Sequence, residues 1–425
     1  MSKILFFCTL FFTIAQAFSQ QVTTVAGYGI AGFLDGPGWQ AQLKGITGVC
    51  TDPQGNIYVA DSGNNRIRKI EATGNHMVST IAGSGVEGYA DGIGTNAVFA
   101  SPNGICIDNQ GNLYVTDFWN YKIRKITPSG VVTTVAGKTP GYVDGTSAIA
   151  KFSYLEGICV DTQGNLFVAD GGNHKIRKIT PTGVVSTIAG STSGYQDGVG
   201  ISAQFDYPNG ICIDNSNTLY VAEFFGGGKI RKIDSLYEVS TIAGSDWGYT
   251  DGQGTTAQFR FPKSICVDNL GNLFVADSGN NRIRKITPSG LVSTYSGSVS
   301  GYLDGFITDA LFKEPQSIYF DSINNYLIIG DGNNYRVRKI ETTLNTRDND
   351  FEKFSVSPNP NKGNFSIYGL QSGNLEIYDL LGKLVFTIKV VNATNQIETP
   401  LKKGLYLVKI CNEEGKTTTQ KMVVE

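Results

Sequence analysis

The sequence predicts an all-β protein whose main part is a six-bladed β-propeller, and three observations support this prediction. The first is a repeat: the segment VADSGNNRIRKI at Val59–Ile70 recurs with small changes and ends at Ile126, Ile179, Ile233, Ile286 and Ile340. The second is the composition, because 52 glycines and 11% aromatic residues suit short strands joined by tight turns. The third is the period, because a unit repeated every 53 to 56 residues cannot bury its apolar face alone and must stack on its neighbours.

Each copy has the pattern of a four-stranded antiparallel meander. The strands of the second copy are predicted at 104–108, 113–116, 122–126 and 131–135. The turn Asp108–Asn112 joins the first two strands, and its Asn and Gly residues accept a positive φ. A loop at 117–120 then leads to the third strand, and the turn Thr127–Gly130 leads to the fourth.

The two ends of the repeat region complement each other. The region begins with a lone fourth strand, predicted at Val22–Ala26, and its last copy stops after a third strand at Arg336–Ile340. Pairing of these two strands completes the sixth blade and removes the two exposed edges of an open array. We therefore predict a closed propeller over residues 21–340, and we expect a monomer.

The segments outside the repeats have other roles. Lys3, an apolar run from Ile4 to Ile14 and the small residues around Ala17 are typical of a secretory signal, so residues 1–20 are predicted to be a signal peptide. The polar residues 341–353 are predicted to be a linker, and alternating apolar runs over 354–425 predict a small β-sandwich. We expect no transmembrane segment, because no later stretch is long and apolar enough.

Motifs in the two parts of the chain resemble two protein families. Copies such as NLYVTDFWNYKIRKI, preceded by SPNGICIDNQG, resemble NHL repeats over residues 22–340, and the segment GYxDGxGxxAxF is similar to one found in bacterial NHL propellers. In the last part, the segments SPNP at 357–360, GNF at 363–365, YDLLGK at 378–383, GLY at 404–406 and KMVV at 421–424 look like the C-terminal sorting domain of the Bacteroidetes type IX secretion system. This resemblance implies the type IX machinery as a partner, passage through the periplasm, and a secreted or cell-surface location.

Charged residues carried by every copy are interpreted as scaffold. The acids at the ends of the second strands are Asp61, Asp117, Asp170, Glu223, Asp277 and Asp331, and each copy carries basic residues in its third strand. We expect these groups to pair within and between blades. Since the net charge is also −2, no nucleic acid is expected as a partner. A further Asp-Gly pair in each connection, from Asp35 to Asp304, offers too few carboxylates for a calcium loop and is interpreted as a turn and cap.

Five cysteines occupy one position of the repeat: Cys50, Cys106, Cys159, Cys212 and Cys266, with Tyr319 in the sixth copy. Residues at matching places on successive blades are expected to lie beyond the roughly 7 Å that a disulfide spans between α-carbons. They are also spread around a ring, whereas metal ligands must converge. We therefore interpret them as small buried apolar residues.

Residues that differ between the copies are the candidates for function. Just before each first strand the copies carry six unlike polar residues, Thr47, Asn103, Glu156, Asn209, Lys263 and Gln316. If the first strands line the central channel, as in known propellers, these side chains gather at one mouth, where a small polar ligand or an ion can be held. The other interpretation left open is a hydrated pole whose polar groups satisfy one another.

A metal site is a further interpretation of this mouth. Asn103 and Asn209 stand in Pro-Asn-Gly-Ile, which is similar to the segment that carries a metal-binding asparagine in the senescence-marker and gluconolactonase propellers. This resemblance implies that an ion, Ca²⁺ or Zn²⁺, would be held by Asn103, Glu156 and Asn209. Lys263 departs from the pattern, because its charge opposes a divalent metal and is placed to neutralise Glu156. The Asp general base of those lactonases has no identifiable counterpart.

The loops between second and third strands also differ between copies. Aromatic residues replace small ones in the second and fourth copies, and with one in a connecting loop the candidates are Phe118, Trp119, Tyr121, Phe225 and Trp247. These loops open on one face of a propeller, so we expect a platform there for a sugar, a peptide or a protein. The alternative is that these rings cover the long connecting loops.

Enzyme motifs are nearly absent from the sequence. After the signal there are two histidines, His76 and His174, too few for the zinc site of the amidating lyase, an NHL enzyme. We find no nucleophile elbow, phosphate loop or spaced Cys/His cluster. The sequence therefore leans away from an enzyme and predicts a binding or scaffolding module, with no catalytic residue, no cofactor, and an unknown protein or carbohydrate as ligand. The alternative is a metal-dependent lactonase or lyase with its site at the channel mouth.

Overall fold

The computed structural model describes residues 20–342 and, nearer the C-terminus, residues 355–357, 359, 361–368, 372–379, 383–391, 395–411 and 417–425. The chain divides into two compact units, Met1–Thr343 and Leu344–Glu425. The predicted signal peptide, apart from Gln20, and most of the predicted linker lie outside the described residues. Within the described residues, no helix has the length and apolar character needed to cross a membrane.

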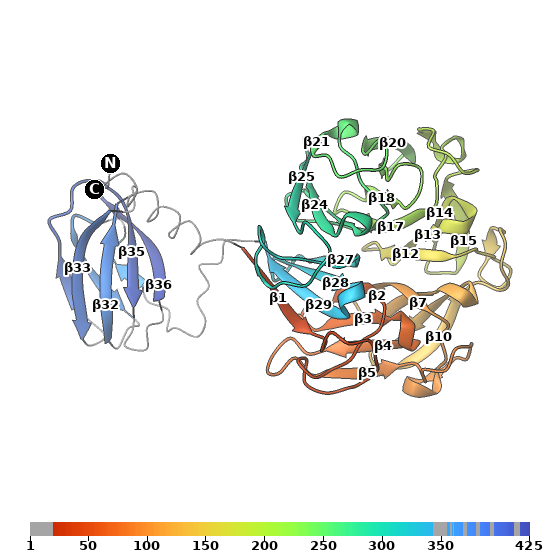
Figure 1. The fold of residues 1–425 in the computed structure, drawn as a ribbon, viewed down its shortest axis with the longest axis horizontal. Helices are drawn as coiled ribbons and strands as arrows, with labels where there is room; N and C mark the ends of the chain where they lie inside the picture. The colour runs from red at the N-terminus through yellow and green to blue at the C-terminus, as the bar shows by residue number, and fades with distance from the viewer. Residues whose placement is uncertain are drawn as a thin grey trace. The chain divides into compact units, whose positions relative to one another are not determined.

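The first unit consists of antiparallel sheets arranged around a centre (Figure 1). The innermost strands are β2 (Ile46–Thr51), β7 (Pro102–Ile107), β12 (Leu155–Val160), β17 (Pro208–Ile213), β22 (Pro262–Val267) and β27 (Pro315–Asp321). The second strands are β3 (Ile57–Asp61), β8 (Leu113–Asp117), β13 (Leu166–Asp170), β18 (Leu219–Glu223), β23 (Leu273–Asp277) and β28 (Tyr326–Asp331). The third strands are β4 (Arg66–Ile70), β9 (Lys122–Ile126), β14 (Lys175–Ile179), β19 (Ile230–Ile233), β24 (Arg282–Ile286) and β29 (Arg336–Glu341).

The outer parts of the sheets hold the remaining strands. The fourth strands are β5 (Val78–Ala82), β10 (Val131–Ala136), β15 (Val184–Ala189), β20 (Glu238–Ala243), β25 (Leu291–Ser296) and β1 (Gln21–Ala26). Two-residue strands from the Asp-Gly connections lie outside five of them: β6 (Gly92–Ile93), β11 (Gly145–Thr146), β16 (Gly198–Val199), β21 (Gly252–Gln253) and β26 (Gly305–Phe306). These short strands cover the outer edges of five sheets, whereas the sheet β2–β5 has none. The sequence pattern did not predict them.

Single turns of 3₁₀-helix complete the first unit. Those after the second strands are η1 (Ser62–Asn64), η3 (Phe118–Asn120), η4 (Gly171–Asn173), η7 (Ser278–Asn280) and η8 (Gly332–Asn334). Those in the connections are η2 (Gly94–Asn96), η5 (Gly200–Ser202) and η6 (Gly254–Thr256). The segment predicted as a loop at 117–120 is thus a helical turn that ends in a left-handed residue, Tyr121 with φ 55°.

The described residues 20–342 form a closed ring of six such sheets. Each innermost strand contacts the innermost strands of both neighbouring sheets, in the order β2, β7, β12, β17, β22, β27 and back to β2. The ring closes through β1, which pairs with β29 so that Val22 faces Ile340 and Thr24 faces Arg338. The predicted pairing of the opening strand with the last third strand is therefore found. The all-β fold of antiparallel meanders is confirmed as well.

Apolar side chains from adjacent sheets form the cores between them. One such cluster joins Cys50 and Ala60 of the sheet β2–β5 to Phe99, Ile105 and Val115 of the next repeat. Both faces of these strands are buried, which explains why the repeat contains apolar runs such as Ile-Tyr-Val-Ala rather than a strict alternation. Stacking of neighbouring sheets thus buries what a single repeat leaves exposed.

Each third strand also carries a fully buried arginine that two carboxylates hold. In the second sheet, Nη1 of Arg124 lies 2.6 Å from Oδ2 of Asp117, and Nη2 lies 2.8 Å from Oδ1 of Asp91. The guanidinium group stacks 4.9 Å from the ring centroid of Phe99. The equivalent arginines are Arg68, Arg177, Arg231, Arg284 and Arg338, and each has the same pair of acidic partners. The pairing with the second-strand acids was predicted from the sequence.

The acid of each Asp-Gly pair has a different role from the predicted turn and cap. Asp91 accepts hydrogen bonds from Arg124 and from the backbone N–H of Thr134 in β10, at 3.2 Å. It therefore fixes the connecting segment to the outer part of the next sheet. The interpretation of these aspartates as local turn formers is incomplete, because their partners lie 33 and 43 residues away in the chain.

The second unit contains two sheets. One consists of β30 (Ser355–Ser357), β31 (Asn364–Tyr368) and β34 (Asn395–Glu398), and the other of β33 (Leu384–Val391), β32 (Ser372–Tyr378), β35 (Gly404–Cys411) and β36 (Thr417–Val424). Phe365 and Ile397 of the first sheet share an apolar cluster with Ile377, Val408 and Met422 of the second. The apolar core of this unit therefore lies between its two sheets.

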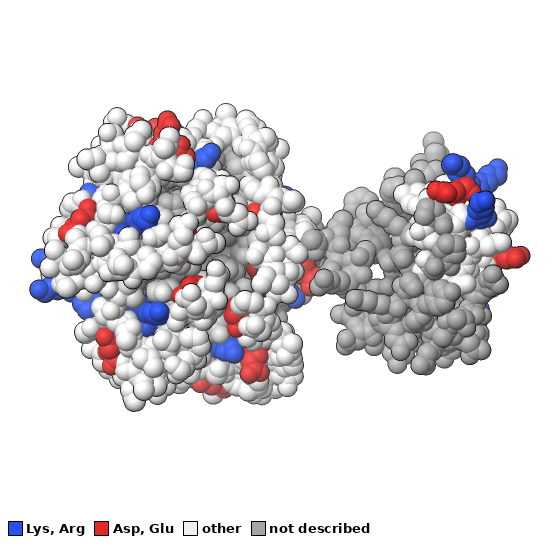
Figure 2. All heavy atoms as spheres, turned by 180° about the vertical axis from the view of Figure 1, so that it is seen from behind, with Lys and Arg blue, Asp and Glu red and all other residues white. Residues whose placement is uncertain are grey.

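Surface charges of both signs are interspersed on the first unit. Figure 2 shows Lys and Arg scattered among Asp and Glu on one of its faces, without a broad patch of one sign. This distribution agrees with a net charge of −2 for the whole chain. This face therefore has no broad positive field that would attract polyanions.

Candidate binding site at the channel mouth

The six polar candidates occupy one structural position, the second residue of each innermost strand. In β2 the pairing with β3 passes from Ile46 to Gly48, so Thr47 has no cross-strand partner. The other five innermost strands have the same interruption of register. A bulge leaves one residue outside the ladder and turns its side chain to a new direction. Here the bulge turns the variable side chain toward the mouth of the channel.

The small residue that follows each candidate lets the innermost strands approach one another. A Cβ atom on Gly104 would lie 2.6 Å from the carbonyl oxygen of Glu156, and one on Gly157 would lie 2.7 Å from that of Asn209. These distances are too short for any side chain. The ring is thus narrow at this level, and the six polar side chains converge.

The converging side chains open into a cavity of about 540 Å³. Its lining includes all six candidates, namely Thr47, Asn103, Glu156, Asn209, Lys263 and Gln316. The other lining residues are Ser62, Ser101, Phe118, Trp119, Tyr207, Phe224 and Phe225. This volume suits a small organic ligand, and the mixture of aromatic walls with a few polar groups is typical of such sites.

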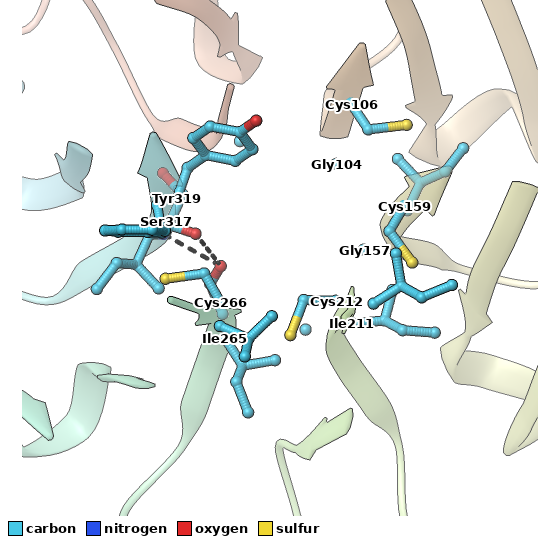
Figure 3. Close-up of a pocket in the computed structure, with 18 of the residues that line it drawn as sticks. Gly104, Cys106, Gly157, Cys159, Ile211, Cys212, Ile265, Cys266, Ser317 and Tyr319 are labelled. Atoms are coloured by element: carbon cyan, nitrogen blue, oxygen red, sulfur yellow. Dashed lines mark hydrogen bonds between the residues drawn. The ribbon is translucent and has the colours of Figure 1, made fainter. Parts of the chain in front are cut away.

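A second cavity, of about 430 Å³, continues along the channel. It shares Thr47, Asn103, Asn209 and Lys263 with the first cavity, so the two are adjacent. Figure 3 shows that the sulfur atoms of Cys106, Cys159, Cys212 and Cys266 surround this part of the channel, with Tyr319 beside them.

The five repeat cysteines are free thiols. Burial raises the pKa of each of them, so they remain protonated and apolar in character. Four are buried as predicted, and Cys212 is half-buried. All of them except Cys50 line the second cavity and give the channel a weakly polar wall there.

Glu156 is the most buried of the six candidates, with 7% of its surface exposed. Its Oε2 accepts a hydrogen bond of 2.5 Å from Nδ2 of Asn103, and the Tyr207 hydroxyl and the Asn209 amide also donate to its carboxylate. Burial raises its pKa to about 7, although these hydrogen bonds and the charge of Lys263 act in the opposite direction. Neutral donors thus satisfy most of the hydrogen-bonding capacity of this carboxylate.

Lys263 is the one cation among the described residues that line the mouth cavity. It is half-buried, and its Nζ lies 5.8 Å from the ring centroid of Phe224. Burial lowers its pKa, while the charges of Glu156 and Glu314 raise it. No ion pair joins Lys263 to a carboxylate within the described part of the chain, so its interaction with Glu156 acts across the cavity.

The remaining candidates differ in whether their side chains already form hydrogen bonds within the protein. The Thr47 hydroxyl donates to the backbone oxygen of Pro102 at 3.1 Å, so it joins two innermost strands. The side chains of Asn209 and Gln316 line the cavity and are half-buried. Thr47 therefore serves the ring closure more than a ligand.

The five aromatic candidates form two clusters rather than one platform. Phe118, Trp119 and Tyr121 gather around Tyr154, with ring centroids 5.4, 5.6 and 5.9 Å from it. Phe225 belongs to a second cluster, which also contains Tyr207, Phe224, Phe261 and Trp247. Phe118, Trp119 and Phe225 line the mouth cavity, whereas Tyr121 and Trp247 do not.

Several residues of the site were missed by the sequence analysis, above all Tyr207 and Phe224. Tyr207 stands two residues before Asn209, at a position with positive φ in every repeat: Gly45, Ser101, Tyr154, Tyr207, Phe261 and Glu314. A left-handed conformation is uncommon for large residues and often marks functional positions. The sequence offered one signal for this position, namely its variation between copies. Three copies have a large aromatic residue there, and the other three have a small or an acidic residue.

The fit of a divalent metal to the mouth is partial. One carboxylate and two carboxamides are ligand types that Ca²⁺ accepts. However, Nδ2 of Asn103 faces Glu156, and Lys263 adds a positive charge to the same cavity. Among the described residues, no group of three or more His, Cys, Asp or Glu side chains is arranged to hold a metal ion.

Three family models match parts of the chain. Residues 355–425 match the secretion system C-terminal sorting domain. Residues 259–286 match the NHL repeat, and residues 49–193 match the SMP-30/gluconolactonase/LRE-like region. The sorting domain indicates export of the protein, either to the cell surface or to the surrounding medium.

Curated proteins from a plant and an animal are similar to this chain. The chain is 28% identical over 293 residues to the chloroplastic protein Suppressor of quenching 1 of Arabidopsis thaliana, which covers 62% of this chain and 27% of that protein. It is 26% identical over 333 residues to NHL repeat-containing protein 2 of Bos taurus, which covers 68% of this chain and 45% of that protein. The match thus spans less than half the length of either relative.

Solved structures show the same fold. An auxiliary nutrient binding protein from Bacteroides thetaiotaomicron VPI-5482 is similar with a TM-score of 0.59 and 20% sequence identity, over 76% of each chain. At this identity the likeness concerns the fold, and it confirms the predicted β-propeller. The chain therefore carries NHL repeats in a β-propeller and ends in a sorting domain of the type IX secretion system.

Proposed function

We propose that the protein is an exported binding protein whose propeller holds a small ligand in the mouth cavity. The observation that carries this proposal is the convergence of six polar side chains, of five different residue types, and five aromatic side chains on one cavity of about 540 Å³. Residues shared by all repeats build the ring, whereas the lining residues differ from repeat to repeat. The sorting domain supports a role outside the cell, and a propeller of similar fold is described as a nutrient-binding protein.

Binding is favoured over catalysis by the chemistry of the lining residues. The buried carboxylate of Glu156 is held by neutral donors rather than by a base or nucleophile. Neither His76 nor His174 lines the cavity. The cavity therefore offers contacts that recognise a ligand, and its described lining contains no histidine that could activate a nucleophile.

Substitution of an aromatic wall tests this proposal. Trp119→Ala is expected to weaken ligand binding about tenfold, because loss of an aromatic contact of roughly 1.5 kcal/mol corresponds to that factor. The measurement is a thermal-shift screen of saccharides, short peptides and small organic acids, followed by calorimetric titration of each compound that raises the melting temperature.

Trp247→Ala is the matched control for this experiment. Trp119 and Trp247 are exposed to 48% and 53%, but Trp247 lies outside the cavity lining. We expect Trp247→Ala to bind like the wild type and both variants to melt near the wild-type temperature. A screen without any binding compound, or equal affinity of Trp119→Ala and wild type, would contradict the proposal.

A metal-dependent hydrolase is the second candidate. It is favoured by the match of residues 49–193 to the SMP-30/gluconolactonase/LRE-like region, which includes Asn103 and Glu156. This candidate predicts one Ca²⁺ or Zn²⁺ per chain in purified protein, lost in Glu156→Ala and kept in Glu314→Ala, a nearby acid outside the cavity lining. Elemental analysis by mass spectrometry measures the ratio, and wild-type protein without stoichiometric metal after incubation with either ion would exclude the hydrolase.

A further inference from the structure

We propose that the mouth cavity selects a small organic monocarboxylate, with the ligand carboxylate on Lys263 and the apolar face of a ligand ring against the aromatic walls. The inference rests on the proposed function, because it names the ligand class of the same cavity. It is argued from the contacts of the two charged side chains at the mouth, Lys263 and Glu156, and from the position of the aromatic rings beside them.

The first step is that no carboxylate of the described residues lies in direct contact with Lys263, although Glu156 and Glu314 act on it at longer range. The buried arginines of the same fold each have two carboxylates in contact, as Arg124 has at 2.6 and 2.8 Å. Lys263 is partly desolvated, yet no carboxylate of the described residues forms an ion pair with it. A desolvated charge without a partner is unfavourable, and an anion from solution removes that cost.

The second step is that Glu156 is already satisfied. Its carboxylate receives hydrogen bonds from Asn103, Tyr207 and Asn209, all of them neutral donors. An ammonium group of a ligand would therefore have to displace donors that the protein supplies. Lys263, in contrast, has three N–H donors and an aromatic ring as its near neighbour. The donors of Lys263 are thus still available to an anionic ligand, whereas the acceptor atoms of Glu156 that a cationic ligand needs are already in use.

The third step limits the ligand to a single negative charge. One negative charge of a ligand is attracted by the Lys263 ammonium group. A second negative charge in the same cavity is repelled by the Glu156 carboxylate, and Glu314 is also near enough to act on Lys263. Like charges repel more strongly where the protein partly shields them from bulk water. The cavity therefore favours monocarboxylates over dicarboxylates and over phosphate dianions.

The fourth step concerns the body of the ligand. Phe224 lies next to Lys263 and stacks on Phe261 with ring centroids 5.0 Å apart, while Phe118 and Trp119 line the cavity as part of the other cluster. Flat rings with an apolar face pack well on such walls. An aromatic acid offers such a flat ring, and the puckered ring of a sugar acid offers an apolar face of C–H groups, so the experiment distinguishes these two sources.

The test uses matched pairs of probes that differ in one charge. Phenylacetate is compared with phenylacetamide, and glucuronate with glucose, by calorimetric titration of the full exported chain at millimolar concentrations. We expect at least one acid to bind about tenfold more tightly than its neutral partner, because a charge-assisted hydrogen bond contributes roughly 1.5 to 3 kcal/mol. Phenylmalonate and inorganic phosphate are expected to bind more weakly than the preferred monocarboxylate.

Two substitutions of Lys263 assign the effect to this residue. Lys263→Met is expected to remove the preference for the acid over its neutral partner, and Lys263→Arg to restore it. Glu156→Gln keeps the size of the side chain and one acceptor oxygen and removes the negative charge, so it is expected to strengthen binding of the acid by severalfold. That gain separates carboxylate binding from a metal site, which Glu156→Gln would weaken. Melting temperatures near that of the wild type establish that the variants are folded.

The other outcomes overturn the inference. Equal affinity for acid and neutral probe, or an unchanged preference in Lys263→Met, contradicts carboxylate recognition but leaves the proposed binding function intact if Trp119→Ala still weakens the neutral probe. Absence of binding by both acids overturns the inference, and the proposed function is then decided by the wider screen of saccharides and peptides.

Discussion

Deletion of the opening strand, residues 20–26, is expected to lower the free energy of unfolding by roughly 5 kcal/mol or more. The strand β1 completes the last sheet through its pairing with β29. Val22 and Ala26 are fully buried, and Val25 is nearly so. Their loss removes apolar contacts and leaves the edge of β29 open, so we also expect association of the truncated protein into dimers or larger species.

A point substitution keeps this prediction testable if the truncated chain does not fold. Val22→Asp places a charge in the apolar cluster around Phe312 and is expected to lower the melting temperature strongly. Gln21→Asp is the matched control, because Gln21 is exposed on the same strand. Thermal unfolding followed by circular dichroism measures both variants, together with size-exclusion chromatography of the deletion. Equal melting of Val22→Asp and Gln21→Asp would contradict closure of the ring by β1.

The second large effect is expected from the buried arginines. Arg124→Met leaves Asp117 fully buried without its ionic partner and removes one contact of Asp91. Breaking a buried ion pair by removing one partner costs about 3 to 5 kcal/mol. Because six equivalent arrangements occur around the ring, the same loss is expected for the other five arginines.

Chemical denaturation with urea measures this loss. Lys125→Met is the control, because the adjacent Lys125 is half-buried and contacts the ring of Tyr114 rather than a carboxylate. We expect the control to change stability by less than about 1 kcal/mol. A loss below about 1 kcal/mol for Arg124→Met would mean that the ion pairs do not hold the connecting segments to the sheets.

The repeat made most of the fold predictable. Strand positions in the second copy were predicted to within two residues, because alternating apolar residues and Gly-Asn turns are local signals. Ring closure followed from the missing strands at the two ends of the repeat region. The short outer strands and the contact of Asp91 with Arg124 were missed, since both depend on how segments more than 30 residues apart meet.

The site was predictable in part for the same reason. Thr47, Asn103, Glu156, Asn209, Lys263 and Gln316 stand out as unlike residues at one repeated position, and the bulge brings all of them to one cavity. Tyr207 was missed because its role depends on a left-handed backbone at φ 58° that turns it toward Glu156. No local pattern indicates that conformation for a tyrosine. Likewise, Trp247 and Tyr121 share the predicted face but pack on other rings instead of lining the cavity.

The content of the mouth cavity tests the account most directly. We would crystallise the exported protein with the organic acid that binds most tightly and collect data at a resolution that distinguishes an ion from an organic molecule. The account predicts an organic ligand between Phe224 and Trp119, with a carboxylate oxygen within hydrogen-bond distance of Nζ of Lys263. A metal ion coordinated by Glu156 and Asn103, or a cavity that holds water alone while the acid lies elsewhere, would contradict it.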